Sequence, residues 1–134
     1  MLKAALIFLF FIAASHVIAQ PISVEDSLRN VIQLHKGDTA EVSALALLGS
    51  NQTQLDSGVK FLQQGLLLAE KLGYKKGEAD CLLRLAQKIS DRGQTIQYCL
   101  DALRIFEELK DAEGVAASHL VLQWTYREAG DYKN

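Results

Sequence analysis

Two cysteines and three histidines are the residues of this sequence best suited to chemistry, and they form no recognisable constellation. Cys81 and Cys99 stand alone, without the Cys-x-x-Cys or His-x-x-His spacings that are typical of zinc ligands. His16 lies in an N-terminal apolar segment, which leaves only His35 and His119. A nucleophile pair between a cysteine and His119 is an alternative, but a cysteine packed inside a helix is the commoner use. We therefore expect no catalytic residue, no metal site and no cofactor.

The charged residues also favour a protein that is not an enzyme. An acidic stretch, formed by Glu107, Glu108, Asp111 and Glu113, is typical of a solvated helix end rather than of paired catalytic carboxylates. The glycines stand singly, so no glycine-rich loop could hold a phosphate group. The formal net charge is -2 at pH 7, and no basic stripe with interleaved aromatic residues is present. Nucleic acid is therefore not an expected partner.

The first nineteen residues have the pattern of a signal peptide. Lys3 provides a positive charge, residues 4–12 form an apolar run, and residues 17–19 end in Ala19 as a small-residue cleavage signal before Gln20. An uncut membrane anchor is the alternative, but the apolar run is shorter than the ~20 residues that span a bilayer. We expect export to the periplasm or the extracellular space. Contact with a membrane is expected only if this segment is retained or a membrane helix follows downstream.

Export to an oxidising compartment raises the question of a disulfide between Cys81 and Cys99. The two cysteines lie on expected neighbouring helices, 12 residues before and 6 residues after Gly93. The difference displaces them by ~9 Å along the helix axes. Together with the spacing between packed helices, this displacement exceeds the ~7 Å separation that a disulfide allows between Cα atoms. We expect two free, buried thiols.

The composition predicts an all-α fold. The only proline is Pro21, and strong helix formers dominate the rest of the chain. Apolar spacing predicts helices near 23–36, 39–49, 54–72, 76–91, 95–109 and 112–129. Glycines are expected to end helices at Gly37, Gly73, Gly93 and Gly130, and Asp38 is expected to cap the following helix. The helix at 76–91 is apolar on more than one face, which is typical of a helix packed between two neighbours.

The sequence also repeats itself at a shift of 37 residues. The shift aligns Gly77 with Gly114, and it also pairs small residues with small ones and large apolar residues with large apolar ones, as in Ala79 with Ala116, Leu83 with Leu120 and Leu85 with Leu122. Such self-similarity is the signature of a repeat architecture.

The repeating unit resembles the tetratricopeptide repeat. The last unit has Leu122, Tyr126 and then Gly130-Asp131-Tyr132, while the middle unit has Leu85, Ala86 and Gly93. The resemblance implies antiparallel helix hairpins in a right-handed solenoid of about two and a half repeats. It places a capping helix in residues 20–38 and the repeats in residues 39–134, with the last repeat incomplete. The stretch between residues 93 and 102 is about three residues shorter than the family pattern, which predicts a second hairpin whose second helix is one turn shorter.

The run from 68 to 77 is similar to repeats that precede the output domain of exported bacterial signalling proteins. The resemblance implies a non-catalytic scaffold that binds a protein or a peptide. The alternative is the N-terminal sensor region of a two-component histidine kinase, in which any kinase or cyclase activity would lie in sequence beyond residue 134.

Two groups of residues are candidates for the function. We expect repeat packing at Gly58, Gly65, Leu85, Ala86, Ala102, Leu122, Tyr126 and Gly130. The final helix has no partner helix in the sequence, so it is expected to expose an interaction face that could mediate self-association. This face comprises Leu120, Leu122, Trp124 and Tyr126.

Overall fold

The computed structural model describes residues 22–131, and all regular structure in that range is helical. The helices are α2 (Val24–Leu34), α3 (Thr39–Asn51), α4 (Leu55–Leu72), α5 (Lys75–Lys88), α6 (Arg92–Glu108) and α7 (Ala112–Asp131). The expectation of an all-α fold is confirmed. The expected signal peptide at residues 1–19 lies outside the described residues.

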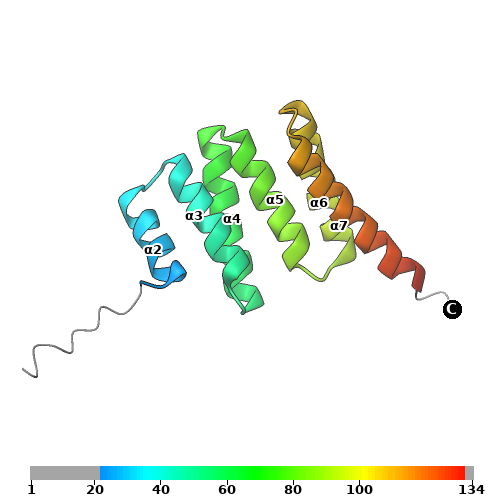
Figure 1. Cartoon of the computed structure of the whole chain (residues 1–134), viewed down its shortest axis with the longest axis horizontal. Helices are drawn as coiled ribbons and strands as arrows, with labels where there is room; N and C mark the ends of the chain where they lie inside the picture. The colour runs from blue at the N-terminus through cyan, green and yellow to red at the C-terminus, as the bar shows by residue number, and fades with distance from the viewer. Residues whose placement is uncertain (1–21, 132–134) are drawn as a thin grey trace, which may run out of the picture.

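The helices follow one another in space in the order of the sequence (Figure 1). Each helix packs against the next one along the chain, from α2 to α7. In addition, α3 contacts α5 and α5 contacts α7. These three helices therefore lie beside one another in a row with α5 in the middle.

The hydrophobic core consists of two clusters that α5 separates. Leu82 and Leu83 of α5 join the cluster formed with α6 and α7, whose centre is the fully buried Phe106. Cys81 and Leu85, on the other side of α5, join the cluster formed with α3 and α4. Apolar residues all around α5 are therefore explained by burial on both sides, as the sequence predicted.

Gly65 lets three helices approach closely within the second cluster. A Cβ atom at this position would lie 3.1 Å from the Cys81 sulfur and 3.3 Å from Cβ of Leu45. Those neighbours belong to α5 and α3, so α4 contacts both helices at one point. A larger side chain here would push the helices apart.

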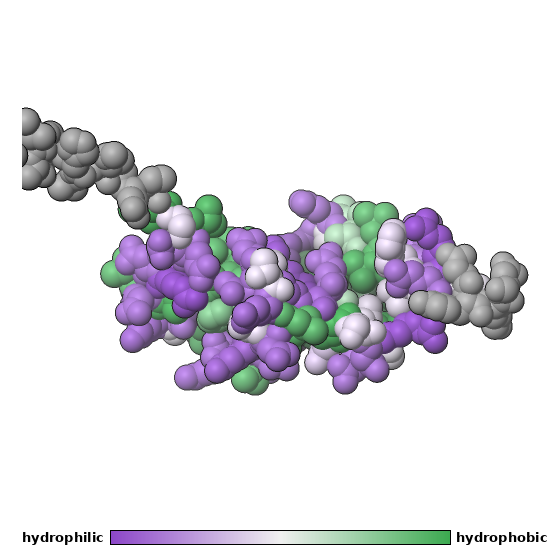
Figure 2. Space-filling view, turned by 90° about the horizontal axis from the view of Figure 1, so that it is seen from below, coloured by the Kyte–Doolittle hydropathy of each residue, from purple (hydrophilic) through white to green (hydrophobic). Residues whose placement is uncertain are grey.

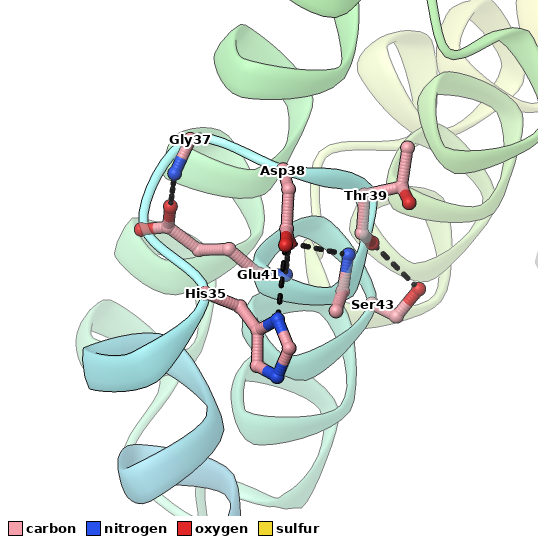
Figure 3. Close-up of polar contacts among 7 residues, drawn as sticks. His35, Gly37, Asp38, Thr39, Glu41 and Ser43 are labelled. Atoms are coloured by element: carbon pink, nitrogen blue, oxygen red, sulfur yellow. Dashed lines mark hydrogen bonds and ion pairs between the residues drawn. The ribbon is translucent and has the colours of Figure 1, made fainter.

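The turn between α2 and α3 is organised by Asp38 (Figure 3). Its carboxylate accepts hydrogen bonds from the backbone N–H groups of Ala40 at 2.8 Å and Glu41 at 3.0 Å, which satisfies two free amides of the first turn of α3. Nδ1 of His35 lies 2.9 Å from the second Asp38 oxygen. Gly37 adopts a φ of 82°, a left-handed conformation that glycine enters without strain.

Helix α2 itself has no buried residue. It packs on α3, and the guanidinium of Arg29 lies 5.7 Å from the centre of the Phe61 ring on α4. The capping segment is thus attached by its surface rather than inserted into the core.

Two of the four glycines expected to end helices lie inside helices instead. Gly73 ends α4 with a φ of 63°, but Gly93 is the second residue of α6 and Gly130 lies within α7. Gly93 lies inside α6 because Asp91 caps the helix two residues earlier. The side chain of Asp91 accepts a hydrogen bond from the backbone amide of Gln94 at 2.7 Å. As a result α6 has 17 residues against 18 in α4, and the expected loss of a turn is not observed.

Candidate interaction groove

Three hollows lie in series along the row formed by α3, α5 and α7. The first lies between α3 and α5, with a volume of about 160 Å³, and shares Asp80 and Arg84 with the second. The second, of about 340 Å³, lies between α5 and α7 and shares Gln87 and Ala117 with the third. Because each hollow shares lining residues with the next, the three hollows are adjacent, and we call this row of hollows the groove.

The third hollow is the largest, with a volume of about 650 Å³. It lies where α7 passes the end of α5, the connection to α6 and the first turn of α6. Its walls carry Leu120 and Trp124 of α7, with Ile89 opposite and Arg92 and Glu128 among the polar lining residues. Six of its twelve lining residues are polar, so the hollow presents apolar and polar surface side by side.

The α5–α6 connection is short because both of its ends are defined by local signals. Helix α5 ends at Lys88, and Ile89 leaves the helix in an extended conformation with ψ of 153°. Asp91 then caps α6, so only three residues separate the two helices. This short connection places Arg92 and Thr95 on the wall of the large hollow.

Polar contacts hold the charged side chains of the groove in place. Arg84 donates a hydrogen bond from Nη1 to the hydroxyl of Ser50 on α3 at 2.8 Å. Nζ of Lys76 lies 2.5 Å from Asp111 and 3.2 Å from Asp80. Partial burial lowers the pKa of Lys76, but the hydrogen bond to Asp111 and the nearby Asp80 outweigh it and raise the pKa overall. The hydrogen bond from Lys76 likewise lowers the pKa of Asp111.

Large apolar side chains are exposed on α7. Leu120 and Trp124 are 66% and 58% exposed, whereas the core residues of α5 are almost fully buried. Figure 2, which views the molecule from below, shows hydrophobic atoms at the surface toward the C-terminal end. Exposed apolar area of this kind is often an interaction site.

Most residues expected at repeat packing positions lie at contacts between helices. Buried side chains or backbones are found at Gly58, Gly65, Leu85, Ala86, Ala102 and Leu122.

The structure differs from the expectation at three residues of α7. Tyr126 is 56% exposed and Gly130 is exposed with no atom within 4 Å of a Cβ at its position, so neither is buried between helices. The reason is that the end of α7 projects beyond its neighbours (Figure 1). Leu122, expected on the exposed face as well, is only 9% exposed because it belongs to the core with Phe106.

Both cysteines are fully buried and free, and they belong to different core clusters. Burial raises the pKa of Cys81 to about 12 and raises that of Cys99 as well. The Cys99 sulfur lies 3.1 Å from the backbone oxygen of Ser118. Thiols with raised pKa values and no solvent contact are poor nucleophiles.

Metal and membrane sites can be assessed only within residues 22–131. There, no group of three or more His, Cys, Asp or Glu side chains is arranged to hold a metal ion. His35 lies at the α2–α3 turn and His119 on the exposed surface of α7. None of the helices in this range combines the length and the apolar character needed to cross a bilayer.

One contact between α5 and the end of α3 was not predicted from the sequence. Nζ of Lys88 donates hydrogen bonds to the backbone oxygens of Ser50 at 3.1 Å and Gln52 at 2.6 Å, at the C-terminal end of α3. Its aliphatic chain passes over Gly58, where a Cβ would lie 2.5 Å from Cε of Lys88. Lys88 and Gly58 are 30 residues apart in the sequence, so their contact becomes apparent only when α4 and α5 are seen packed together.

Comparisons of this chain with family models, with curated proteins and with solved structures found no match. Its function is therefore argued from its own residues.

Proposed function

We propose that this protein is an exported, non-catalytic scaffold that binds an extended segment of another protein in the groove along α3, α5 and α7. The observation that carries the proposal is the row of three adjacent hollows, in which each hollow shares two lining residues with the next. A row of hollows along three helices suits a linear ligand better than a compact small molecule.

The charges of the groove indicate the chemistry of that ligand. Three basic residues line it, Lys76, Arg84 and Arg92, and three acidic ones, Asp80, Glu113 and Glu128. Because the two signs balance, a strongly charged ligand gains no net attraction. The exposed Leu120 and Trp124 favour an apolar or aromatic side chain at the large hollow.

We further propose that the helices form a right-handed solenoid of tetratricopeptide-like hairpins. The burial of aligned residues supports this: at the 37-residue shift, Leu85 and Leu122 are both buried, as are Cys81 and Ser118. Gly77 and Gly114 also correspond, since a Cβ at either would collide with an aromatic ring, that of Tyr74 or that of Phe106. In a repeat, equivalent positions are expected to have similar burial and similarly little room, although the two rings themselves, of Tyr74 and Phe106, are not at aligned positions.

Selection of peptides from a random library tests the binding proposal. The full chain serves as bait, and selected peptides are titrated against it while the fluorescence of Trp124, the single tryptophan, is recorded. We expect enriched peptides with an apolar or aromatic core, bound at least about tenfold more weakly by Trp124→Ala because hot-spot aromatics dominate such interfaces. Isothermal titration calorimetry measures binding to the variant that lacks tryptophan.

Tyr126→Ala is the matched control, since Tyr126 is equally exposed on the same helix but does not line the groove. Its affinity should equal that of the unmodified chain. Peptides that bind equally well to both variants, or a library without enrichment, would show that the groove is not the binding site.

A further inference from the structure

The outward side of α7 carries five exposed residues in one stripe. Glu113, Ala116, Leu120, Trp124 and Arg127 are all exposed, and they follow one another at intervals of three or four residues. At 100° per residue, all five lie within about 40° of Leu120 around the helix. The guanidinium of Arg127 lies 4.8 Å from the centre of the Trp124 ring, which places those two side chains together.

This stripe lies opposite the side by which α7 packs, and three of its residues, Glu113, Leu120 and Trp124, also border the groove. Helix α7 packs only against α6 and α5 within residues 22–131, and it does so through the opposite side. Ser118, Leu122 and Thr125 are the buried residues of that opposite side. The stripe is therefore a helix face available to a partner.

The residues of the stripe at equal distances before and after Leu120 are complementary to one another. Glu113 and Arg127 lie seven positions before and after Leu120, and they carry opposite charges. Ala116 and Trp124 lie four positions before and after it, and they are small and large. If a second copy packed antiparallel on the stripe with Leu120 at the centre, Glu113 would face Arg127 of the other copy, and Ala116 would face Trp124.

We propose that the protein forms a two-fold symmetric homodimer through antiparallel pairing of α7 with α7 of a second copy, with Leu120 at the axis. Glu113 of each copy pairs with Arg127 of the other copy. The two charge pairs lie at the two ends of the contact, about 21 Å apart along the helix axis. The indole of Trp124 fills the space beside Ala116 of the other copy. Such an interface is isologous, so one surface serves both partners.

The dimer is expected to be weak. A single helix face per copy buries less area than the standard interface between stable partners, so the dimer fraction should rise with concentration. Balanced charges at both ends select the antiparallel register, because a parallel pair would place Glu113 against Glu113. The dimer would cover Leu120 and Trp124, which also line the groove, so a bound peptide would compete with it; mass and cross-linking measure the dimer with no peptide present.

Exchange of the two charges tests the register. Sedimentation velocity on the full chain should show a monomer–dimer equilibrium whose dissociation constant rises about tenfold in Glu113→Arg and in Arg127→Glu, because each change places like charges at both ends. The double variant restores opposite charges and should restore dimerisation. Arg104→Glu, an exposed change on α6, is the control and should leave the equilibrium unchanged. Failure of the double variant to recover would overturn the proposed register.

Cross-linking tests the position of the axis. In Leu120→Cys the two introduced sulfur atoms, one from each copy, would lie close together at the axis. Mild oxidation should therefore yield a covalent dimer on a non-reducing gel. Tyr126→Cys is equally exposed on α7 but points away from the stripe and should remain monomeric. The native Cys81 and Cys99 are fully buried and do not compete. Equal cross-linking of both variants, or of neither, would refute the axis at Leu120, as would a chain that stays monomeric at every concentration.

Discussion

Gly49 and Gly58 face each other across the contact between α3 and α4, each without room for a methyl group. A Cβ on Gly58 would lie 2.7 Å from the backbone oxygen of Gly49, and a Cβ on Gly49 would lie 2.8 Å from that of Gly58. Side-chain atoms of Leu62 and Lys88 are equally close, but these two oxygens are backbone atoms, so relief requires movement of a whole helix. The spacing of α3 and α4, and with it the start of the groove, depends on these two glycines.

Gly58→Ala should therefore destabilise the fold. Overpacking costs about 1–3 kcal/mol, and the better helix propensity of alanine offsets up to ~1 kcal/mol of it. We expect a net loss of about 1–2 kcal/mol in the free energy of unfolding, measured by urea denaturation followed by circular dichroism. Gly93→Ala is the control, because its added Cβ meets only Asp91 at an ordinary 3.4 Å. It should be neutral or stabilising. Equal effects in both variants would mean that α3 and α4 are not in close contact.

Cys81 and Cys99 should react with thiol reagents only when the chain unfolds. Both side chains are fully buried and have raised pKa values, so thiolate is scarce and inaccessible in the folded protein. A maleimide reagent at pH 8 should label neither residue quickly, and two thiols per chain should appear in urea without reductant. Rapid labelling of one residue in the folded state would contradict its burial, and fewer than two thiols in urea would indicate a disulfide.

Stability should fall in acid because two carboxylates have lowered pKa values in the folded state. Backbone hydrogen bonding, led by the Glu41 amide, lowers the pKa of Asp38 below its ordinary 3.8, and the hydrogen bond from Lys76 lowers that of Asp111. Each carboxylate stabilises the fold fully above its unfolded pKa, and this stabilisation is lost as the pH falls through the folded pKa. The thermal midpoint should thus drop between about pH 4 and pH 2.

Asp111→Asn identifies the contribution of one of these groups. The amide can still accept the hydrogen bond from Gly114, which the carboxylate accepts at 3.0 Å, but it carries no charge for Lys76. The variant should have a lower thermal midpoint at pH 7 and a smaller further loss between pH 4 and pH 2. A variant that loses as much in acid as the unmodified chain would show that Asp111 is not among the responsible groups.

The exported protein should begin at Gln20. The small residues at 17–19 after the apolar run motivate this cleavage position. Intact-mass measurement on the protein recovered from the exported fraction checks it, with Ala19→Arg as a variant that should block cleavage. A soluble exported form that retains residues 1–19 would disprove the predicted signal peptide.

The sequence was sufficient to predict the helices and many of their contacts. Local signals determine these features: the apolar spacing of α5 marked burial on two sides, and Asp38 marked the start of α3. Small residues such as Gly65 and Ala102 lie buried where the repeat pattern put them.

The groove could not be predicted in the same way. Its largest hollow depends on how far α7 extends beyond the end of α5, and Tyr126 fits the repeat motif although its side chain is mostly exposed. Lys88 is another example, because its role arises from the missing side chain of Gly58 on a different helix. Such features depend on distances between elements, which residue spacing within one element does not define.

Helix α2 contributes no buried side chain to the core, and that determines which part of the protein opens first. Its amide hydrogens can exchange with solvent through a local opening that leaves α3 to α7 folded, at a free energy well below that of global unfolding. The same opening presents Arg29 to trypsin while the arginines of α5 and α6 stay protected. The cooperative unit of the described chain is therefore expected to begin at Thr39, with α2 opening separately from it.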